Sequence, residues 1–543
     1  MRTWARPTCL THFSLLVFNT SHPPLSEHDQ NPYATNECPA ELLCTVEQVQ
    51  CLLGSLDTTK ATGPDGVSAT MLKHTALFIA PSVTKLFNLS ISSGQVPTDW
   101  KRSTVVPIPK SSDRSSPTNY RPISLLSILS KTLERHIHSL IATHLADNQL
   151  LSDRQWGFLP GKGTVTALLA TTHNWFQSLE NNKDVCAVFF DYRKAFDSVA
   201  HRPLLEKMSQ LSINETIIQW VSSYLTSRRQ SVVLNGATSD SANVLSGVPQ
   251  GSVLGPLLFI IYVNDLAAMQ LSQDSQIILY ADDLLLFRPI STSADYVALQ
   301  KDISELEQWT VNNSLQFNTA KCNYMVITRR RCPTLPLNPL ILNGVTLKQV
   351  DMFKYLGLLI TSDLSWSRHI DSICSRAKRI LGMLYRQYYH NVDCNTMRCL
   401  YLSLVRPHLE YGCSVWDPHT QKDIQALERV QKFACKMATQ NWNAGCDELN
   451  DLVNLPSLQH RRLQLKLCQL YKIIHGLSYF PDDIFIPRQN FSNRSSNNKS
   501  LLQPFAHTNA FLFSFVPHTI RTWNSLSTSQ VNAVSLSSFK YTL

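Results

Sequence analysis

Apolar and polar residues follow two different patterns along the chain, and the change comes after Arg331. Between Phe189 and Phe287 short apolar runs of strand length alternate with amphipathic helical stretches, such as residues 203–223. From residue 369 to about 476, apolar residues recur every three or four positions, which predicts helices with one buried face. The chain therefore has the pattern of an α+β fold followed by a mostly helical region.

Two apolar runs in the first region end in carboxylates. The run that begins at Val185 is continuous, as in a central strand covered on both faces, and it ends at Asp191. A second pair of runs, before and after residues 280–283, predicts a hairpin with Asp282 and Asp283 at its tip. Two adjacent carboxylates there would repel each other and lose hydration, and a divalent cation would compensate both effects. A polar hairpin turn is the alternative interpretation of the pair.

Oxygen ligands from two neighbouring strands suit Mg²⁺, which usually completes its coordination with water and substrate phosphate. Two such ions roughly 3.5–4 Å apart can activate an attacking oxygen and stabilise a leaving one in a phosphoryl displacement. The pattern therefore predicts a metal site made by Asp191, Asp282 and Asp283.

Other elements follow from local signals. We expect an irregular segment over residues 1–40, a short helix from about Thr45 and a strand over 104–109 that ends at Lys110. Spacings of three and four residues from Leu126 to Leu140 predict a helix with one buried face. Residues 232–236 predict a hairpin, and the polar tract 489–500 predicts a flexible linker.

Composition adds few constraints. A chain of 543 residues predicts two or three domains, and 43% hydrophobic with 16% charged residues is typical of a globular protein. The net charge of +9 permits a polyanionic partner without requiring one. Fourteen scattered cysteines without metal-type spacing suggest reduced thiols of an intracellular protein. No apolar run is long enough to cross a bilayer, so no membrane association is expected.

From Lys60 to the C-terminus, the order of segments resembles the reverse transcriptases of non-LTR retrotransposons, of the Jockey and chicken-repeat kind. Residues 60–66 resemble the segment before the fingers, while Lys110 and 119–123 resemble the fingers motifs. Motifs A, B, C and D and the primer grip resemble, in that order, residues 190–197, 246–256, 280–283, 318–321 and 353–357. So many matches in the correct order are very improbable by chance.

The resemblance implies a right-hand polymerase fold. We expect an irregular N-terminal segment over 1–52, fingers and palm over 53–360, a helical thumb and connecting region over 361–480, and a linker with a C-terminal segment over 481–543. It also implies an RNA-directed DNA polymerase that extends a DNA primer on an RNA template with dNTPs and Mg²⁺, Mn²⁺ being an alternative. Asp191 and Asp282 would bind the metals, with Asp283 a weaker ligand and the carbonyl of Tyr192 a backbone ligand.

Several residues would bind the incoming nucleotide if the resemblance holds. Lys110 and Arg121 supply cations for the triphosphate, although either could be an ordinary solvated side chain. The ring of Phe196 would lie beneath the sugar and exclude a 2′-hydroxyl, which selects DNA as the product. Gln250 and Gly251 belong to a loop whose small residues let the backbone approach a nucleic-acid strand. Lys321 could protonate the departing pyrophosphate, with a plain surface lysine as the alternative.

The remaining site predictions lie in the second half of the chain. Tyr355, Leu356 and Gly357 resemble the primer grip. A basic stretch follows, which we expect to contact the phosphate backbone of the template–primer duplex unless it is merely a solvated helix face. Its members are Arg368, Arg376, Lys378, Arg379 and Arg386. The stretch 404–412 also recurs in this family, with no role that we can assign beyond packing.

The chain departs from the family pattern at Leu159 and Gly163, which weakens a template-contact role there. Full elements carry an N-terminal endonuclease, and the first 60 residues are too few for one, so we expect the polymerase portion of an element. A decayed copy that only binds nucleic acid is the main alternative, and an RNA-dependent RNA polymerase is the next. The resemblance implies a cytoplasmic ribonucleoprotein that acts in the nucleus. Oligomeric state stays open.

Overall fold

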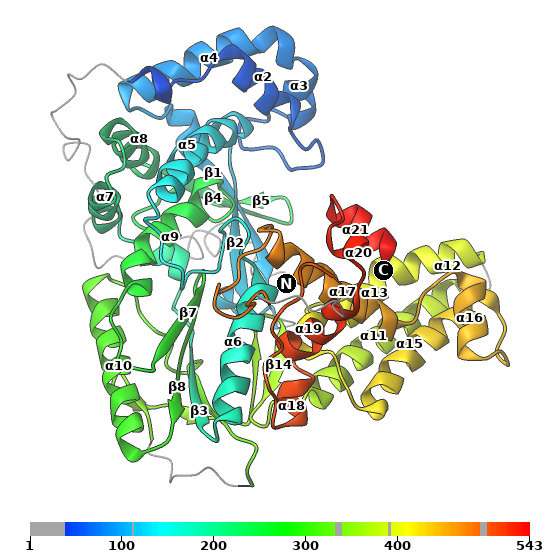
Figure 1. The fold of residues 1–543 in the computed structure, drawn as a ribbon. Coiled ribbons are helices and arrows are strands. Elements are labelled where there is room, and N and C mark those ends of the chain that lie inside the picture. Colours follow the sequence, from blue (N-terminus) through cyan, green and yellow to red (C-terminus); the bar gives the residue numbers. More distant parts are fainter. Residues whose placement is uncertain (1–38, 111–112, 332–338, 389–391, 489–496) are drawn as a thin grey trace.

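The structure is a computed structural model that describes residues 39–110, 113–331, 339–388, 392–488 and 497–543. Most of the segment predicted to be irregular, 1–40, and most of the predicted linker, 489–500, lie outside the described residues. Figure 1 shows a small helical lobe at the N-terminal end, a central sheet with helices on both sides, and a helical region that extends to one side of it.

The central sheet, which we call the palm sheet, has five strands in the order β12-β9-β3-β8-β7. Strand β3 pairs antiparallel with both β8 and β9, and all of its residues are buried. The predicted central strand and the predicted hairpin β7–β8 are therefore confirmed. The strands are β3 (Asp184–Phe190), β7 (Gln276–Tyr280), β8 (Asp283–Ile290), β9 (Asn323–Ile327) and β12 (Lys348–Gln349).

Alternate residues of β3 point into two different hydrophobic cores, as the period of a strand requires. Val188 and Phe190 belong to a core shared with the fingers and the N-terminal helices, whereas Ala187 and Phe189 belong to a core shared with the C-terminal region. Helix α10 (Ser293–Asn312) packs on the first face and α6 (Thr164–Glu180) on the second, on opposite sides of the sheet in Figure 1.

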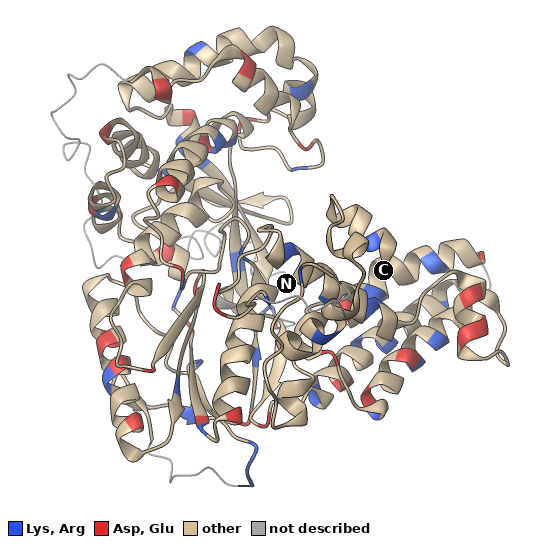
Figure 2. Ribbon diagram, in the orientation of Figure 1, with Lys and Arg blue, Asp and Glu red and all other residues tan. Residues whose placement is uncertain are grey.

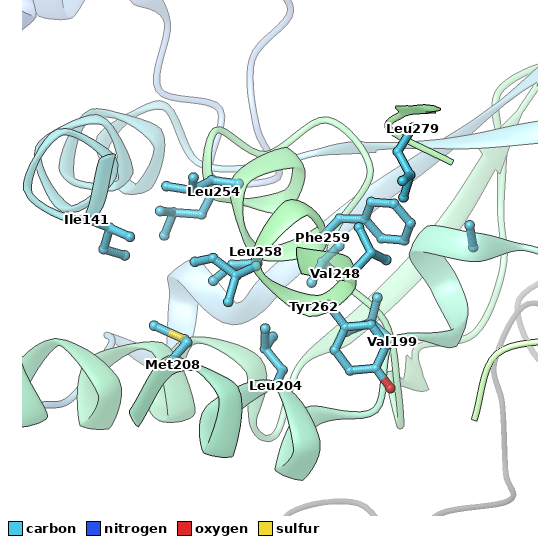
Figure 3. Close-up of a cluster of buried hydrophobic side chains, with 14 of the residues drawn as sticks. Ile141, Val199, Leu204, Met208, Val248, Leu254, Leu258, Phe259, Tyr262 and Leu279 are labelled. Carbon is cyan, nitrogen blue, oxygen red and sulfur yellow. The ribbon is translucent and has the colours of Figure 1, made fainter. Parts of the chain in front are cut away.

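Helix α9 (Leu254–Ala267) is apolar on all sides from Leu254 to Val263, and nearly all residues of that stretch are buried. Figure 3 shows Leu254, Leu258, Phe259 and Tyr262 packed among residues of several surrounding elements. Some of these residues come from α5 (Ile128–Asp147) and α7 (His201–Gln210). The helix is thus a rigid base beneath the loops that lead to the candidate site.

The fingers contain a second sheet in the order β2-β1-β4-β5, with β6 also paired to β4. The predicted strand 104–109 and the predicted hairpin at 232–236 are confirmed by β1 and by β4–β5. The predicted stretch 203–223 divides into α7 and α8 (Glu215–Leu225), because Asn214 caps the second helix. The strands are β1 (Arg102–Pro109), β2 (Tyr120–Leu125), β4 (Arg229–Leu234), β5 (Ala237–Thr238) and β6 (Ala242–Asn243).

The N-terminal lobe consists of α2 (Val46–Gly54), α3 (Ala69–His74) and α4 (Ala76–Ser93). A capping box between Thr45 and Gln48 begins α2, which confirms the helix predicted there. The predicted boundary at residue 52 is wrong, because it falls inside this helix. The Asn88 side chain accepts a hydrogen bond from Cys44 N at 2.8 Å and so ties the start of α2 to α4.

Helices dominate after residue 366, as predicted. They are α11 (Ser367–Tyr388), α12 (Cys394–Leu400), α13 (Arg406–Glu410), α14 (Cys413–Trp416), α15 (Gln421–Thr439), α16 (Cys446–Val453), α17 (Leu458–Ile474), α18 (Asn509–Leu512), α19 (Phe515–Ser525), α20 (Thr528–Val531) and α21 (Leu536–Thr542). Two short hairpins precede them, β10 (Ile341–Leu342) with β11 (Val345–Thr346) and β13 (Met352–Tyr355) with β14 (Leu358–Thr361).

The end of the chain is not a separate appendage, which corrects the predicted linker for residues 497–500. Asn497 is buried, and its side-chain amide donates to the carbonyls of Trp523 and Leu526 at 2.9 and 3.0 Å. Trp523 and Phe539 belong to the same core as the second face of β3. The expected division at 480/481 therefore does not separate two packing units. Among the described residues, no helix is both long and apolar enough to cross a membrane.

Candidate active site

Strand register brings the three predicted carboxylates to one end of the palm sheet. Phe190, the last residue of β3, pairs with Leu284 of β8, so that Asp191 follows on one strand and Asp283 precedes on the other. Tyr280 pairs with Asp283, which leaves Ala281 and Asp282 as the two-residue turn of the hairpin. Asp191 and the Asp282–Asp283 pair thus lie side by side, although Asp282 comes 91 positions after Asp191 in the sequence.

The carboxylates repel each other electrostatically. Burial raises the pKa of Asp282, and the charge of Asp191 raises it further. Burial raises the pKa of Asp283 to about 6, with additional contributions from Asp282 and Asp191. This mutual destabilisation of the ionised forms is what a bound cation would relieve.

Three basic residues face this cluster. Lys321 Nζ lies 3.4 Å from Asp191 Oδ2. Lys110 and Arg121 lie at the end of the β1–β2 hairpin, where Lys110 N donates to Asn119 O at 2.7 Å. The charges of both side chains oppose the rise in the pKa of Asp282. Burial and the neighbouring charges of Arg121 and Lys321 lower the pKa of Lys110. The three cations therefore concentrate positive charge where an anionic triphosphate would lie.

The donor set fits a divalent ion held partly by substrate. Within the described ranges, no three His, Cys, Asp or Glu side chains are already arranged around a common metal position. Mg²⁺ commonly uses only one or two carboxylates and takes its other ligands from water and phosphate. Asp191 and Asp282 can supply those two carboxylates. The ring of Tyr192 is buried against Phe317, so only its backbone carbonyl could serve as the predicted additional ligand.

Phe196 is fixed on the floor of the site. It lies on the short helix Ala195–Ser198 that follows Asp191, and its half-buried ring stacks on Phe259 of α9 with centroids 4.5 Å apart. Its backbone carbonyl accepts a hydrogen bond from Val248 N at 2.9 Å. A ring that is stacked on a buried helix, with its backbone hydrogen-bonded to the next loop, cannot move aside easily to admit a bulkier sugar.

Gln250 and Gly251 lie in the loop between the fingers and α9. Gln250 Nε2 donates to Asp197 Oδ1 at 2.9 Å, and Gln250 O accepts from Ser124 N at 2.7 Å. Gly251 has φ +108°, and a Cβ there would lie 2.8 Å from Ser124 O. The glycine is therefore required by both its conformation and the close approach of β2.

Sequence reasoning missed two residues that support the site. Asp197 is buried and anchors Gln250, and burial raises its pKa to about 7. Gln155 is also buried, and its Oε1 accepts hydrogen bonds from Gly157 N at 2.8 Å and from Ala281 N at 3.2 Å. It therefore holds the turn that carries Asp282. Asp197 lies in the stretch that resembles motif A, but nothing local in the sequence indicates that either side chain is buried.

The predicted primer grip is the β13–β14 hairpin. Leu356 and Gly357 form its turn with φ +44° and +89°, and buried Tyr355 lies near enough to Asp283 for that charge to contribute to its raised pKa. A cavity of about 600 Å³ connects this turn with Asp191, Asp283 and Lys321. The hairpin therefore borders the same space as the carboxylates.

The predicted basic residues lie on one long helix, α11, and all five are exposed. Arg368, Arg379 and Arg386 are close to whole numbers of turns apart, so they share one face. Figure 2 shows Lys and Arg along this helix, with acidic residues gathered on α16 at the outer end of the same region. A single basic face is more informative than the local charge alone, because a duplex backbone can contact all three arginines together.

This arrangement, an antiparallel palm sheet with carboxylates at one end, fingers before it and a helical region after it, defines a right-hand polymerase fold. Residues 108–360 match the family model described as reverse transcriptase (RNA-dependent DNA polymerase). The fingers and palm of this chain are thus similar to the reverse transcriptase family.

Two relatives from Drosophila melanogaster illustrate the similarity. A probable RNA-directed DNA polymerase from transposon X-element is 28% identical over 395 residues, 72% of this chain and 42% of the relative. The RNA-directed DNA polymerase from mobile element jockey is 29% identical over 407 residues, 71% of this chain and 43% of the relative. The chain spans less than half the length of these relatives.

Solved structures resemble the chain only distantly. A telomerase from Candida tropicalis in complex with a fragment of telomeric RNA has a TM-score of 0.37 and 12% identity, covering 73% of this chain and 61% of the telomerase chain. A likeness at this level does not bear on the details of the site.

Proposed function

We propose that this protein is an RNA-directed DNA polymerase that copies retrotransposon RNA into cDNA from a primer 3′-hydroxyl. The observation that carries the proposal is the juxtaposition of Asp191 with Asp282 and Asp283, opposite Lys110, Arg121 and Lys321. Anions on the protein and cations facing them across a cleft suit a reaction in which charge neutralisation and alignment of phosphates lower the barrier.

Asp191 and Asp282 would hold Mg²⁺, with Mn²⁺ as a substitute, and the bound ions would neutralise charge on the attacking and leaving oxygens. The residues of the chain supply the rest. Lys110 and Arg121 bind the triphosphate, Phe196 supports the deoxyribose, and Gln250 contacts the nascent base pair. The primer 3′-hydroxyl loses its proton to solvent as its oxygen forms a bond to the α-phosphorus and the bond to the bridging oxygen breaks. Lys321 gives a proton to the departing pyrophosphate and regains one from solvent.

The test is primer extension by the full chain on poly(rA)/oligo(dT) with dTTP. Asp282→Ala should lower the rate by about 10³-fold or more, because a ligand of the cations that neutralise charge in the transition state is lost. Asp451→Ala is the matched control, since Asp451 is an exposed acid on α16. Equal extension by the wild type and by Asp282→Ala would refute the proposal, and it would leave the decayed nucleic-acid-binding remnant as the better interpretation.

Metal binding can be tested without activity. Mg²⁺ should raise the melting temperature of the wild-type protein, because the ion binds the folded site and relieves repulsion between its carboxylates. Asp282→Ala should lose most of this shift, and Asp451→Ala should retain it. A shift of equal size in all three proteins would mean that the ion binds elsewhere.

A further inference from the structure

Tyr411 contacts the turn of the β13–β14 hairpin from the C-terminal region. Its hydroxyl donates to the Leu356 carbonyl at 2.9 Å and lies 3.2 Å from Thr164 Oγ1 at the start of α6. One side chain therefore connects three parts of the molecule that are far apart in sequence. The sequence gives the stretch 404–412 no role beyond packing, and this contact supplies one for its tyrosine.

The Leu356 carbonyl needs such a partner. Tyr355 and Leu358 are the last pair of the hairpin, so the two turn residues between them lie outside the ladder. Leu356 and Gly357 both have positive φ, a conformation that is costly for leucine. A hydrogen bond to the turn opposes its relaxation to other conformations. The Tyr411 ring also lies against the turn, because a Cβ on Gly357 would lie 2.8 Å from Tyr411 Cε1.

Tyr411 is itself well anchored. Its carbonyl accepts a hydrogen bond at 2.8 Å from Nε1 of Trp416, a fully buried residue. Gly412, with φ +64°, lets the chain turn directly afterwards from α13 into α14 and pack against Leu358. By contrast, Tyr411 is 44% exposed, so its contribution comes from the contact with the turn more than from burial in the core.

The turn lies next to the chemistry. Leu356 and Gly357 line the same cavity as Asp191 and Asp283, and Lys354 of the same hairpin lines it too. A shift of the turn would therefore change the space between the primer end and the carboxylates.

We propose that Tyr411 is a positioning residue. It holds the 356–357 turn in the position that places the primer 3′ end next to Asp191 and Asp283. This proposal rests on the proposed polymerase function. It predicts a defect in use of the primer end, not in nucleotide binding, because Lys110, Arg121 and Phe196 lie on other elements.

The experiment compares Tyr411→Phe with Thr164→Val in single-nucleotide addition. Tyr411→Phe removes only the hydroxyl and should lower kcat about tenfold, while the KM for dTTP and the Kd for template–primer stay within about twofold. Thr164→Val keeps the bond to Leu356 and should stay within about twofold of wild type in kcat. A wild-type kcat for Tyr411→Phe, or a defect confined to the KM for dTTP, would overturn the proposal.

Hydrogen exchange of the peptide covering 353–361 provides a readout independent of catalysis. Exchange should rise in Tyr411→Phe and stay at the wild-type level in Thr164→Val; no rise would overturn the proposal. If the wild type itself adds no nucleotide, the polymerase function fails first, and exchange still decides whether Tyr411 holds the turn. If Tyr411→Phe does not fold, Gly357→Ala should lower kcat more than Gly344→Ala, since Gly344 has φ +70° and no atom near its Cβ position. Equal effects would overturn the proposal.

Discussion

Gln250 and Asp197 form one hydrogen-bonded unit, although they lie in two stretches that resemble different motifs. The Gln250 amide donates to the Asp197 carboxylate at 2.9 Å, and Ser246 Oγ donates to the Asp197 carbonyl at 2.8 Å. Asp197 directly follows Phe196, so these bonds fix the loop that presents Gln250 relative to the ring beneath the proposed sugar site. In the proposed polymerase, selection of the base pair and of the sugar would thus depend on one structural unit.

The buried Asp197 carboxyl should make stability depend on pH. Burial raises its pKa from 3.8 to about 7, against opposing effects of the Gln250 hydrogen bond, Lys194 and Lys110. A raised carboxyl pKa means that the folded protein holds a proton that the unfolded chain releases, so stability falls as pH rises from about 4 through about 7. The nearby His201, which is hydrogen-bonded to the Gly247 carbonyl, has its pKa lowered by burial. Its contribution to stability therefore rises as the pH rises, opposite to that of Asp197.

We therefore expect Asp197→Asn to remove the Asp197 contribution while keeping an acceptor for Gln250. Between pH 5 and pH 8, the free energy of unfolding of metal-free wild type should fall further than that of Asp197→Asn, by on the order of 2–4 kcal/mol. The variant therefore gains stability relative to wild type as the pH rises. Urea unfolding at the two pH values measures this difference. Asp451→Asn, an exposed acid, should show no such gain, and parallel pH profiles for wild type and Asp197→Asn would contradict the expectation.

Replacing Phe196 with alanine should relax the choice of sugar. The ring is held by its stack on Phe259, and its loss opens the space that a 2′-hydroxyl needs. We expect the preference for dTTP over UTP, as the ratio of kcat/KM values, to fall by about 10–100-fold, mainly through better use of UTP. Phe505→Ala is the control, because Phe505 is 79% exposed and remote from the site in sequence. An unchanged ratio in Phe196→Ala would mean that another residue excludes ribonucleotides.

The sequence was enough to predict which carboxylates converge, but it did not predict which residues hold the loops around them in place. Asp191 and Asp282 could be paired because each ends or interrupts an apolar run of strand length, and strand ends that share a sheet edge converge. Gln155 and Tyr411 act through hydrogen bonds to the backbone at Ala281 and Leu356, and such contacts leave no pattern in sequence. The prediction of a linker is wrong at residues 497–500 for a related reason. Asn497 resembles a linker residue by composition, but its amide is satisfied by distant carbonyls in the folded chain.

The basic face of α11 should contribute a salt-dependent affinity for template–primer. Replacement of Arg368, Arg379 and Arg386 by glutamine removes three exposed charges from one face. If all three contact phosphates, the slope of log K against log salt should become shallower by about 2–3. Lys378→Gln is the control, because Lys378 lies on a different side of the same helix and should change the slope by less than about one. A triple variant with the wild-type slope would show that this face is only solvated, the alternative that the charge pattern alone leaves open.

The segment after residue 497 should contribute to the stability of the whole C-terminal region, because it packs in the same core. Trp523 is fully buried, its Nε1 donates to Lys499 O at 2.9 Å, and it contacts Phe539 with ring centroids 5.8 Å apart. Trp523→Ala should therefore cost about 3–5 kcal/mol in the free energy of unfolding, measured by urea titration. Tyr541→Ala is a suitable control, since Tyr541 lies on the neighbouring helix α21 and is 94% exposed, and it should cost less than about 0.5 kcal/mol. Because Trp523 and the second face of β3 share one core, the destabilised variant should also lose extension activity at temperatures where wild type is folded. A Trp523→Ala protein as stable as Tyr541→Ala would restore the interpretation of residues 481–543 as a linker with a separate C-terminal segment.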